Sequence, residues 1–318
     1  MVELSVIIPV YNEENNISSV YSRCIEVVGS ICNSFELIFV NDGSKDGSFQ
    51  TILTLSSKDA RVKFINLSRN FGHQIAVSAG LDACSGKYAV IIDADLQDPP
   101  ELIRELYSKV HEGYDVAYAK RNIRKGETLF KTITAKFFYR ILTKITSIQI
   151  PLDTGDFRII SRKVIDVLKQ MPEQQKFLRG QIAWVGFKQT AVAYNRDERV
   201  EGQSGYTIRK MIRLALDGIT SFSNLPLRIA TIAGFMVSGI TFCVAMYALY
   251  ARFISKDYVP GWTSIIISVL FIGGVQLITI GIIGEYISRI SSNVRNRPLY
   301  VISDTNLDYS KVNEKSSQ

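Results

Sequence analysis

The chain has 318 residues, of which 47% are hydrophobic and 21% charged, and its formal net charge is +7. This length allows one large domain or two ordinary ones, and the apolar content is high for a purely soluble enzyme, which indicates segments in lipid. The positive charge favours anionic partners such as nucleotides, lipid phosphates or an acidic membrane surface. Nucleic acid is not expected as a partner, because no basic run is interleaved with aromatic residues.

Cysteine and histidine usage argues against a zinc site. The four cysteines have no CxxC spacing, and the two histidines are His73 and His111. The thiols suit a reducing compartment. The N-terminus begins at once with an apolar strand and lacks the charged region and cleavage site of a signal peptide. We therefore expect the globular part to stay in the cytosol.

Up to about residue 115, short β-branched runs alternate with helical patterns. Strands are expected at Leu4–Val10, Phe35–Asn41, Val62–Leu67 and Tyr88–Asp93, and helices after Glu13, Ser48 and Gln74. This alternation predicts an α/β fold with a doubly wound, mostly parallel sheet and helices on both faces. Ligands of such sheets bind beyond the carboxyl ends of the strands. Polar stretches at 9–14, 40–48 and 93–98 follow three of these strands, so the chemistry is expected on one rim. The sequence has no GxGxxG after the first strand and no GxxxxGK[ST], which argues against dinucleotide dehydrogenases and P-loop proteins.

The composition changes from Leu227 onward, where uncharged stretches occupy 229–251 and 258–284. Each exceeds the roughly 20 residues that span a bilayer, so we expect a hairpin of two transmembrane helices at about 229–251 and 262–284. Core helices of a soluble protein are the alternative. Basic residues number seven in the flanks and two in the turn: Arg209, Lys210, Arg213, Arg228, Arg289, Arg295 and Arg297, against Arg252 and Lys256. This bias places the N-terminal domain and both termini in the cytoplasm.

The segments on either side of the hairpin have different expectations. Residues 206–226 show apolar side chains at helical spacing with basic ones mostly opposite, which predicts an interfacial helix, with a plain surface helix as the alternative. The tail after Ile302 is polar and is expected to be disordered. The expected organisation is therefore a domain at 1–205, the juxtamembrane helix at 206–226, the two membrane helices within 227–288 and a cytoplasmic, partly disordered tail at 289–318.

The stretch IIDADLQDPPE, at 91–101, places three carboxylates within six residues after an apolar strand. Residues i and i+2 of an extended chain point the same way, so Asp93 and Asp95 can face one cation while Ala94 turns into the fold. Mg²⁺ and Mn²⁺ prefer hard oxygens and usually keep positions for substrate phosphate, so this pair predicts a clamp for a metal-diphosphate. The order Asp-Pro-Pro-Glu from Asp98 instead predicts a capping box that starts the next helix.

Four motifs occur in order within residues 4–228: SVIIPVYNEENNI, VNDGSKDGS, the run from NLSRNFGHQ to DADLQDPPE, and TGDFRIISRKV. Together they resemble the polyisoprenyl-phosphate branch of the family 2 glycosyltransferases. That branch includes dolichol-phosphate mannose synthases and bactoprenol glucosyl transferases, and the pair of apolar segments resembles the bactoprenol type. The resemblance implies a nucleotide-sugar-binding fold of GT-A type.

The resemblance also implies roles for single residues. The positions that match nucleotide-sugar contacts are Pro9, Tyr11, Glu13, Asp42, Asp93 and Arg199. Asp95 and Gln97 match metal and diphosphate contacts, and Asp156 occupies the position of a catalytic base. The acceptor-phosphate positions are Arg121, Lys131, Arg196 and Ser204. Some of these residues have an alternative: a tight turn at Asp42, a buried acid paired with a neighbour such as Arg158 for Asp156, and solvated surface charge for the basic residues.

The reaction implied by the resemblance is inverting transfer of a hexose from UDP-glucose to polyprenyl (undecaprenyl) phosphate, with Mg²⁺ or Mn²⁺, by a multi-pass protein of the inner (plasma) membrane. GDP-mannose or a UDP-aminosugar as donor, and a nucleotide-binding membrane adaptor without catalysis, stay open as alternatives. A processive polysaccharide synthase is disfavoured, because the QxxRW motif is absent and the nearest candidate reads RGQIAW at 179–184. Glycines in the apolar segments would permit close helix packing and a homo-oligomer.

Overall fold

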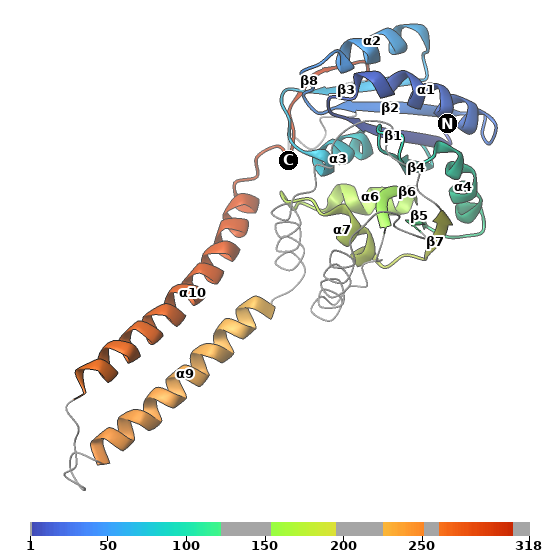
Figure 1. The fold of residues 1–318 in the computed structure, drawn as a ribbon. Coiled ribbons are helices and arrows are strands. Elements are labelled where there is room, and N and C mark those ends of the chain that lie inside the picture. The colour runs from blue at the N-terminus through green and yellow to red at the C-terminus, as the bar shows by residue number, and fades with distance from the viewer. Residues whose placement is uncertain (1, 122–153, 195–224, 251–260, 308–318) are drawn as a thin grey trace. The chain divides into compact units, whose positions relative to one another are not determined.

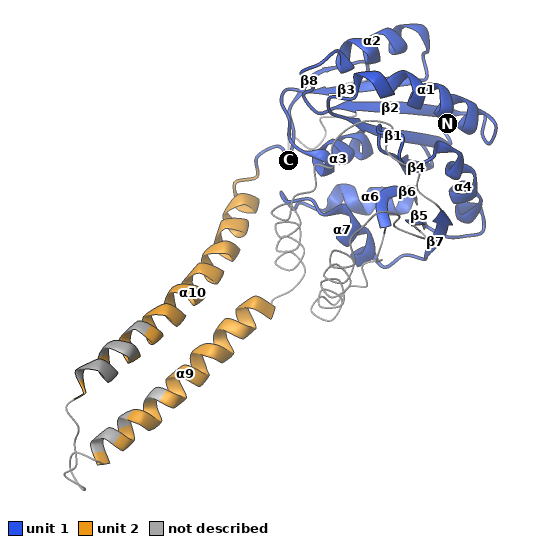
Figure 2. Ribbon diagram, in the orientation of Figure 1, with its two compact units in different colours: residues 1–143, 148–207, 297–318 blue, residues 144–147, 208–296 orange. Residues whose placement is uncertain are grey.

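The computed structural model describes residues 2–121, 154–194, 225–250 and 261–307. The chain divides into two compact units, shown in different colours in Figure 2. Unit 1 comprises residues 1–143, 148–207 and 297–318, and unit 2 comprises residues 144–147 and 208–296. The interfacial helix expected at 206–226 lies almost entirely outside the described residues, and so do Lys131, Arg196, Arg199 and Ser204.

An eight-stranded sheet forms the centre of the described part of unit 1, in the order β7-β5-β6-β4-β1-β2-β3-β8. The strands are β1 Leu4–Val10, β2 Phe35–Asn41, β3 Val62–Leu67, β4 Tyr88–Ile91, β5 Val116–Arg121, β6 Thr154–Ser161, β7 Gln189–Tyr194 and β8 Ile302–Thr305. Parallel pairs join β4, β1, β2 and β3 in turn and also join β5 to β7. β6 runs antiparallel to both of its neighbours, and β8 runs antiparallel to β3. The predicted α/β fold with a mostly parallel sheet is confirmed.

Helices cover both faces of this sheet (Figure 1). They are α1 Glu14–Gly29, α2 Ser48–Lys58, α3 His73–Ala83, the 3-10 turn η1 Pro100–Leu102, α4 Ile103–His111, α6 Arg162–Gln170 and α7 Leu178–Val185. Side chains of α1, α2 and α4 bury on one face, while those of α3, α6 and α7 bury on the other. Alternate strand residues feed the two cores, so Val6 and Ile8 join the first and Ile7 joins the second. The central strands β1 and β4 therefore read as nearly continuous apolar runs, as expected for a sheet covered on both faces.

The chain that follows Ile302 is ordered as far as residue 307, and the expectation of disorder is wrong for this stretch. β8 pairs with the edge strand β3, and the Asn306 side chain adds two bonds to the same strand. Its Nδ2 donates to the Val62 carbonyl at 3.0 Å, and its Oδ1 accepts from the Phe64 N–H at 2.8 Å. The composition is polar, but the open backbone groups of an edge strand supply partners for polar side chains and for the main chain.

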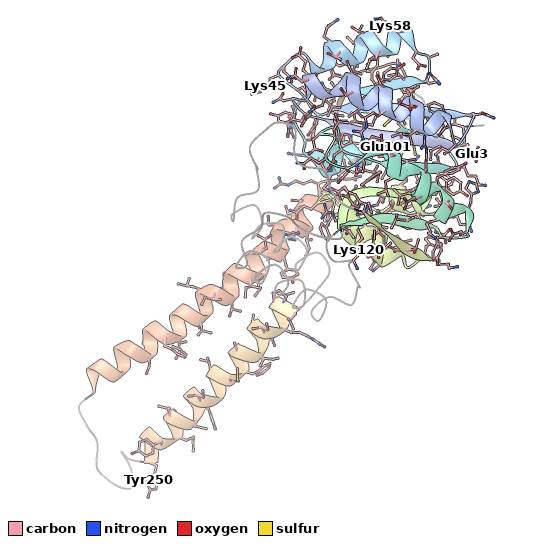
Figure 3. The ribbon with its side chains drawn as sticks, turned by 45° about the vertical axis from the view of Figure 1, so that its right-hand side comes forward. Glu3, Lys45, Lys58, Glu101, Lys120 and Tyr250 are labelled. Atoms are coloured by element: carbon pink, nitrogen blue, oxygen red, sulfur yellow. The ribbon has the colours of Figure 1, made fainter. Side chains whose placement is uncertain are left out.

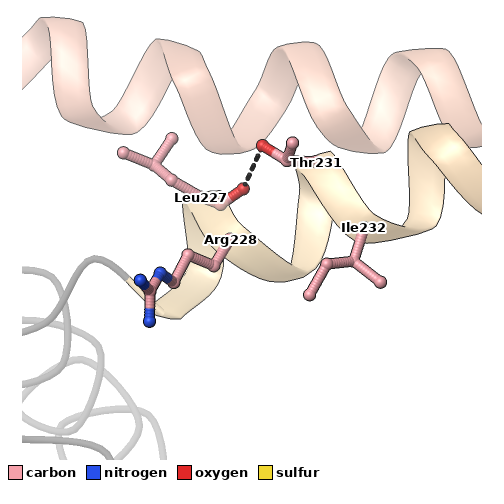
Figure 4. A pocket seen from close by; sticks show the side chains of 4 residues that line it. All are labelled: Leu227, Arg228, Thr231 and Ile232. Atoms are coloured by element: carbon pink, nitrogen blue, oxygen red, sulfur yellow. Dashed lines mark hydrogen bonds between the residues drawn. The ribbon is translucent and has the colours of Figure 1, made fainter.

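Unit 2 contains two long apolar helices, α9 Leu225–Tyr250 and α10 Trp262–Val294, which contact each other. Among the described residues, these are the helices long and apolar enough to cross a membrane, judged by length and composition. α10 continues ten residues past the predicted end at 284, where Glu285 and Arg289 form an i,i+4 ion pair on its surface. Near the start of α9, Leu227, Arg228, Thr231 and Ile232 line a surface pocket (Figure 4).

Candidate active site

Two loops at the carboxyl ends of β1 and β2 are bonded to each other and form one part of the rim. The Asn12 N–H donates to Ser44 Oγ at 3.0 Å, and the Lys45 N–H donates back to Asn12 Oδ1 at 2.8 Å. The Glu13 N–H donates to Ser48 Oγ at 2.9 Å. Asn12 adopts a left-handed backbone with φ 56°, a conformation that asparagine tolerates better than most residues. Lys45 lies at the outer surface of unit 1 in Figure 3. These reciprocal bonds preform the rim without a ligand.

Three residues predicted to contact the nucleotide sugar lie on or beside this first loop. Pro9 is buried within β1, whereas Tyr11, one residue past the strand end, is 44% exposed. The Glu13 carboxylate accepts a hydrogen bond from Asn16 Nδ2 at 2.6 Å, within the first turn of α1. The structure therefore presents the Tyr11 ring at the surface of the rim and keeps Pro9 inside the sheet.

Asp42 is buried directly after β2 and holds the loop that leads into α3. Its Oδ1 and Oδ2 accept the backbone N–H groups of Phe71 and Gly72 at 2.7 and 2.9 Å. Burial raises the pKa of Asp42, and the two backbone hydrogen bonds oppose that rise. Gly72 has φ 104°, which only glycine adopts readily. Asp42 thereby fixes where α3 begins, and with it the positions of His73 and Gln74.

Asp156 accepts hydrogen bonds from three side chains. His73 Nε2 and Gln74 Nε2 each lie 3.1 Å from its Oδ2, and Arg179 Nε lies 2.7 Å from its Oδ1. Burial alone would raise the pKa of Asp156, but the charge of Arg179 and the hydrogen bond with His73 hold it well below its usual range. The carboxylate is therefore ionised at neutral pH, and His73 Nε2 carries the proton of the bond between them.

The antiparallel direction of β6 explains how Asp156 reaches this rim. Ile91, the last residue of β4, pairs with Arg158 in β6. Because the pairing is antiparallel, two residues further along β4 corresponds to two residues back along β6, which brings Asp93 and Asp156 to the same end. His73 lies between them, with Nε2 3.6 Å from Asp93 Oδ1.

Asp93 and His73 have shifted pKa values for opposite reasons. Burial raises the pKa of Asp93 to about 6, with His73 lowering it and the neighbouring carboxylate of Asp156 raising it further. Desolvation would lower the pKa of His73, but the hydrogen bond with Asp156 and the charge of Asp93 outweigh it and raise the pKa to about 9. The Oδ1 atom of Asp93 is buried and accepts no hydrogen bond from the described residues. Acidic and basic groups thus alternate from Asp93 through His73 and Asp156 to Arg179.

The predicted metal residues lie in a tight loop after β4. The Gln97 N–H donates to Asp95 Oδ1 at 3.1 Å, and Leu96 between them has φ 57°, a left-handed conformation that a leucine rarely adopts. Ala94 is buried, as predicted. Among the described residues, no three His, Cys, Asp or Glu side chains converge as a metal cluster. The carboxylates and the amide oxygen of this loop, with the unpartnered Asp93 Oδ1, fit a Mg²⁺ or Mn²⁺ ion that takes its other ligands from substrate and water.

The prediction that Asp98 caps the next helix is wrong. η1 begins after Pro99, which makes no side-chain cap bond, and Asp98 is buried and accepts a hydrogen bond from the Tyr194 hydroxyl. Glu101, labelled in Figure 3, pairs with Arg23 of α1 at 2.6 Å instead of completing a capping box. A buried tyrosine hydroxyl needs a partner, and Asp98 supplies it, which links the Asp95 loop to the end of β7.

The residues that bond Asp156 were largely missed by sequence reasoning. Arg158, the neighbour considered as its partner, is buried and donates to the carbonyls of Gly155 and Asp156 at 2.8 and 3.2 Å, and its Nη2 lies 4.0 Å from Asp156 Oδ1. The closer cation is Arg179. His73 and Gln74 are polar residues at the end of the motif NLSRNFGHQ, but Arg179 lies on α7 and belongs to no comparable pattern. Arg121 ends β5 opposite Tyr194 of β7.

Comparison with known proteins identifies the family. Residues 5–168 match Glycosyl transferase family 2. The Bacillus subtilis (strain 168) protein named Uncharacterized glycosyltransferase YkcC is 50% identical, covering 95% of this chain and 93% of its own. The chain belongs to glycosyl transferase family 2. It is therefore a glycosyltransferase, and the predicted family is confirmed.

One further sequence relative and one solved structure also resemble the chain. The SfII prophage-derived bactoprenol glucosyl transferase of Shigella flexneri is 41% identical, covering 94% of this chain and 97% of its own. The crystal structure of Staphylococcus aureus TarS residues 1–349 with UDP-GlcNAc has a TM-score of 0.48 and 17% identity, covering 70% of this chain and 67% of that one.

Proposed function

We propose that this glycosyltransferase moves a hexose from UDP-glucose to polyprenyl phosphate, undecaprenyl phosphate in a bacterial membrane, with inversion at the anomeric carbon. The observation that carries the proposal is the 41% identity to a bactoprenol glucosyl transferase over 94% of the chain, a span too long to omit the two apolar helices. A single in-line displacement by the acceptor phosphate gives the inverted product. The acceptor needs no deprotonation, because a phosphate oxygen is already anionic.

The geometry of Asp156 suits a reaction with an anionic nucleophile. A carboxylate whose pKa lies well below its usual range is a poor general base, because it has little tendency to take a proton in the transition state. Asp156 acts instead as a fixed hydrogen-bond acceptor that orients a substrate group at the rim. His73 and Arg179 supply positive charge next to it, which limits its repulsion of the two phosphate-bearing substrates.

Asp95 and Gln97, with Asp93 beside them, would hold Mg²⁺ or Mn²⁺, and the ion would offset charge on the departing diphosphate. Tyr11, Glu13, Asp42 and Pro9 then form the side of the rim assigned to the base and ribose, with Arg199 as a further donor contact. The acceptor phosphate is assigned to Arg121, Lys131, Arg196 and Ser204.

The membrane is the source of the acceptor. α9 and α10 have the length and composition to form the two spans, and their basic flanks favour an inner (plasma) membrane topology with unit 1 and both termini in the cytoplasm. The helix expected at 206–226 would lie in the interface beside them. A homo-oligomer packed along the spans is supported by five glycines, Gly234, Gly239, Gly273, Gly274 and Gly281, because no neighbouring atom of the described residues lies within 4 Å of a Cβ placed at any of them.

The test uses the full chain in detergent or proteoliposomes with undecaprenyl phosphate and a panel of labelled donors: UDP-glucose, GDP-mannose and a UDP-aminosugar. We expect metal-dependent labelling of the lipid from UDP-glucose. Lipid labelled from another donor would correct the sugar while keeping the reaction, and nucleotide binding without labelled lipid or nucleotide release would favour a membrane adaptor.

The variant Asp95→Ala tests the metal assignment. This variant should fold and remain in the membrane fraction but transfer no sugar at any Mg²⁺ or Mn²⁺ concentration, because the loop loses a hard oxygen ligand. Full activity of this variant would remove Asp95 from the site.

A further inference from the structure

Gln74 makes two hydrogen bonds that join the candidate catalytic carboxylate to a helix. Its Nε2 donates to Asp156 Oδ2 at 3.1 Å, and its Oε1 accepts the backbone N–H of Leu178 at 3.1 Å. The two partners fix the amide orientation, because only the nitrogen can donate to a carboxylate and only the oxygen can accept from an N–H. One side chain of α3 therefore contacts both β6 and α7.

Leu178 is the first residue of α7, and the next residue is Arg179. The first N–H groups of a helix lack partners inside the helix, and the preceding residue, Phe177, makes no side-chain cap bond here. Gln74 thus caps α7 from a neighbouring element. Gln74 therefore holds the first turn of α7, from which the Arg179 guanidinium reaches Asp156 Oδ1.

The two carboxylate oxygens of Asp156 accept different numbers of hydrogen bonds. An ionised carboxylate has about four acceptor positions, two on each oxygen. Among the residues that the structure describes, His73 and Gln74 both donate to Oδ2, whereas Arg179 alone donates to Oδ1. The position left for a substrate hydroxyl is therefore on Oδ1, and the contact that Gln74 makes helps to direct it there.

We propose that Gln74 is a positioning residue for sugar transfer: it closes the second acceptor position of Asp156 Oδ2 and holds the first turn of α7, so that Asp156 Oδ1 and Arg179 face the substrates in one fixed arrangement. The inference rests on the proposed function, since it assigns Gln74 to the same site. Gln74 acts through Asp156 and touches no reacting atom.

Two substitutions separate the two bonds. Gln74→Leu removes both. Gln74→Glu keeps an acceptor for the Leu178 N–H but replaces the donor with a second carboxylate beside Asp156, where like charges repel. The matched control is Gln189→Leu, because Gln189 Nε2 donates to the Ile182 carbonyl at 2.9 Å and so supports α7 without contacting Asp156.

With UDP-glucose and undecaprenyl phosphate, we expect kcat to fall about tenfold in Gln74→Leu and further in Gln74→Glu, with KM for UDP-glucose within about twofold of the unmodified chain. Gln74→Glu should lose thermal stability, because its carboxylate repels that of Asp156. Gln189→Leu should lose stability and keep kcat. A kcat loss in the Gln74 variants that is matched in Gln189→Leu, or no kcat loss, would overturn the proposal.

A second readout needs no substrate. The chain has two histidines, so ¹⁵N-histidine labelling gives a resolvable His73 ring, whose shifts report its bond to Asp156. These shifts should change in both Gln74 variants and stay unchanged in Gln189→Leu, and unchanged shifts in the Gln74 variants would refute the inference. If the unmodified chain transfers no sugar to the lipid, the proposed function fails, while this readout still decides whether Gln74 positions Asp156 against His73.

Discussion

Replacing Arg179 with methionine tests whether the ion pair with Asp156 holds the site together. The substitution keeps an unbranched apolar stem on α7 and removes the guanidinium that bonds Asp156 Oδ1 at 2.7 Å. Loss of a hydrogen bond to a charged group costs about 1.5–3 kcal/mol, and breaking a fully buried pair costs about 3–5 kcal/mol. Here the two side chains are 23% and 13% exposed, and His73 and Gln74 still bond the carboxylate. We therefore expect the free energy of unfolding to fall by about 2 kcal/mol in Arg179→Met.

The assay is thermal unfolding of the full chain in detergent, in which about 2 kcal/mol corresponds to a fall in Tm of about 4–8 °C for a domain of the size of unit 1. Arg23→Met is the control, because the Arg23–Glu101 pair has a similarly short N–O distance of 2.6 Å but side chains that are 34% and 49% exposed. An exposed pair contributes about 0–1 kcal/mol, so its Tm should change little.

A double variant separates charge pairing from simple loss of packing. When Asp156 is already asparagine, removing the Arg179 guanidinium leaves no carboxylate without its cation. Adding Arg179→Met should therefore cost less stability than it does in the unmodified chain. Equal Tm values for Arg179→Met and Arg23→Met, or strictly additive effects in the double variant, would refute the reasoning.

Three further predictions follow from particular contacts. Asp156→Asn should leave UDP-glucose binding intact, measured by calorimetry, while transfer falls at least 100-fold; equal loss of both would indicate a structural acid. Asn306→Ala should destabilise unit 1 by about 1–2 kcal/mol in the same melts, because two backbone groups of β3 lose partners, whereas the neighbouring exposed Asp304→Ala should not. The hydrogen bond with Arg61 lowers the pKa of Asp59 to about 2, so its stabilisation is present above about pH 4 and is lost as the pH falls toward 2; Asp59→Asn should flatten that part of the stability curve.

The sequence predicted the fold well because the decisive signals are local. The first four strands are short β-branched runs buried on both faces, and their helices follow within a few residues. The polar stretches after β1, β2 and β4 also lie where the rule for parallel sheets places them. The strands β5, β6, β7 and β8 were not predicted. For β8 the reason is that four polar or half-buried residues become a strand only when an edge is available to pair with them.

The residues of the candidate site were predicted unevenly, because some are located by local signals and others by contacts between residues far apart in the sequence. Asp42 follows β2 directly and Asp93 lies two residues past the end of β4, so their location needed no tertiary information. The partners of Asp156 lie 83, 82 and 23 residues away from it, and no periodicity or capping pattern reports such contacts. Asp98 shows the converse error, because a local capping pattern was outweighed by a hydroxyl 96 residues away.

The location of Asp156 depends on one property that the sequence does not encode locally, the direction of β6. Asp156 lies near the start of its strand. In a parallel strand that position would lie at the amino ends of the strands, whereas Asp42 and Asp93 lie at the carboxyl ends. β6 runs antiparallel to β4, so its beginning meets the end of β4, and Asp156 comes within hydrogen-bond reach of a helix that starts after β3. The residues of the TGDFR motif were therefore identifiable from resemblance, but their presence at the rim follows from a reversal of chain direction after β5.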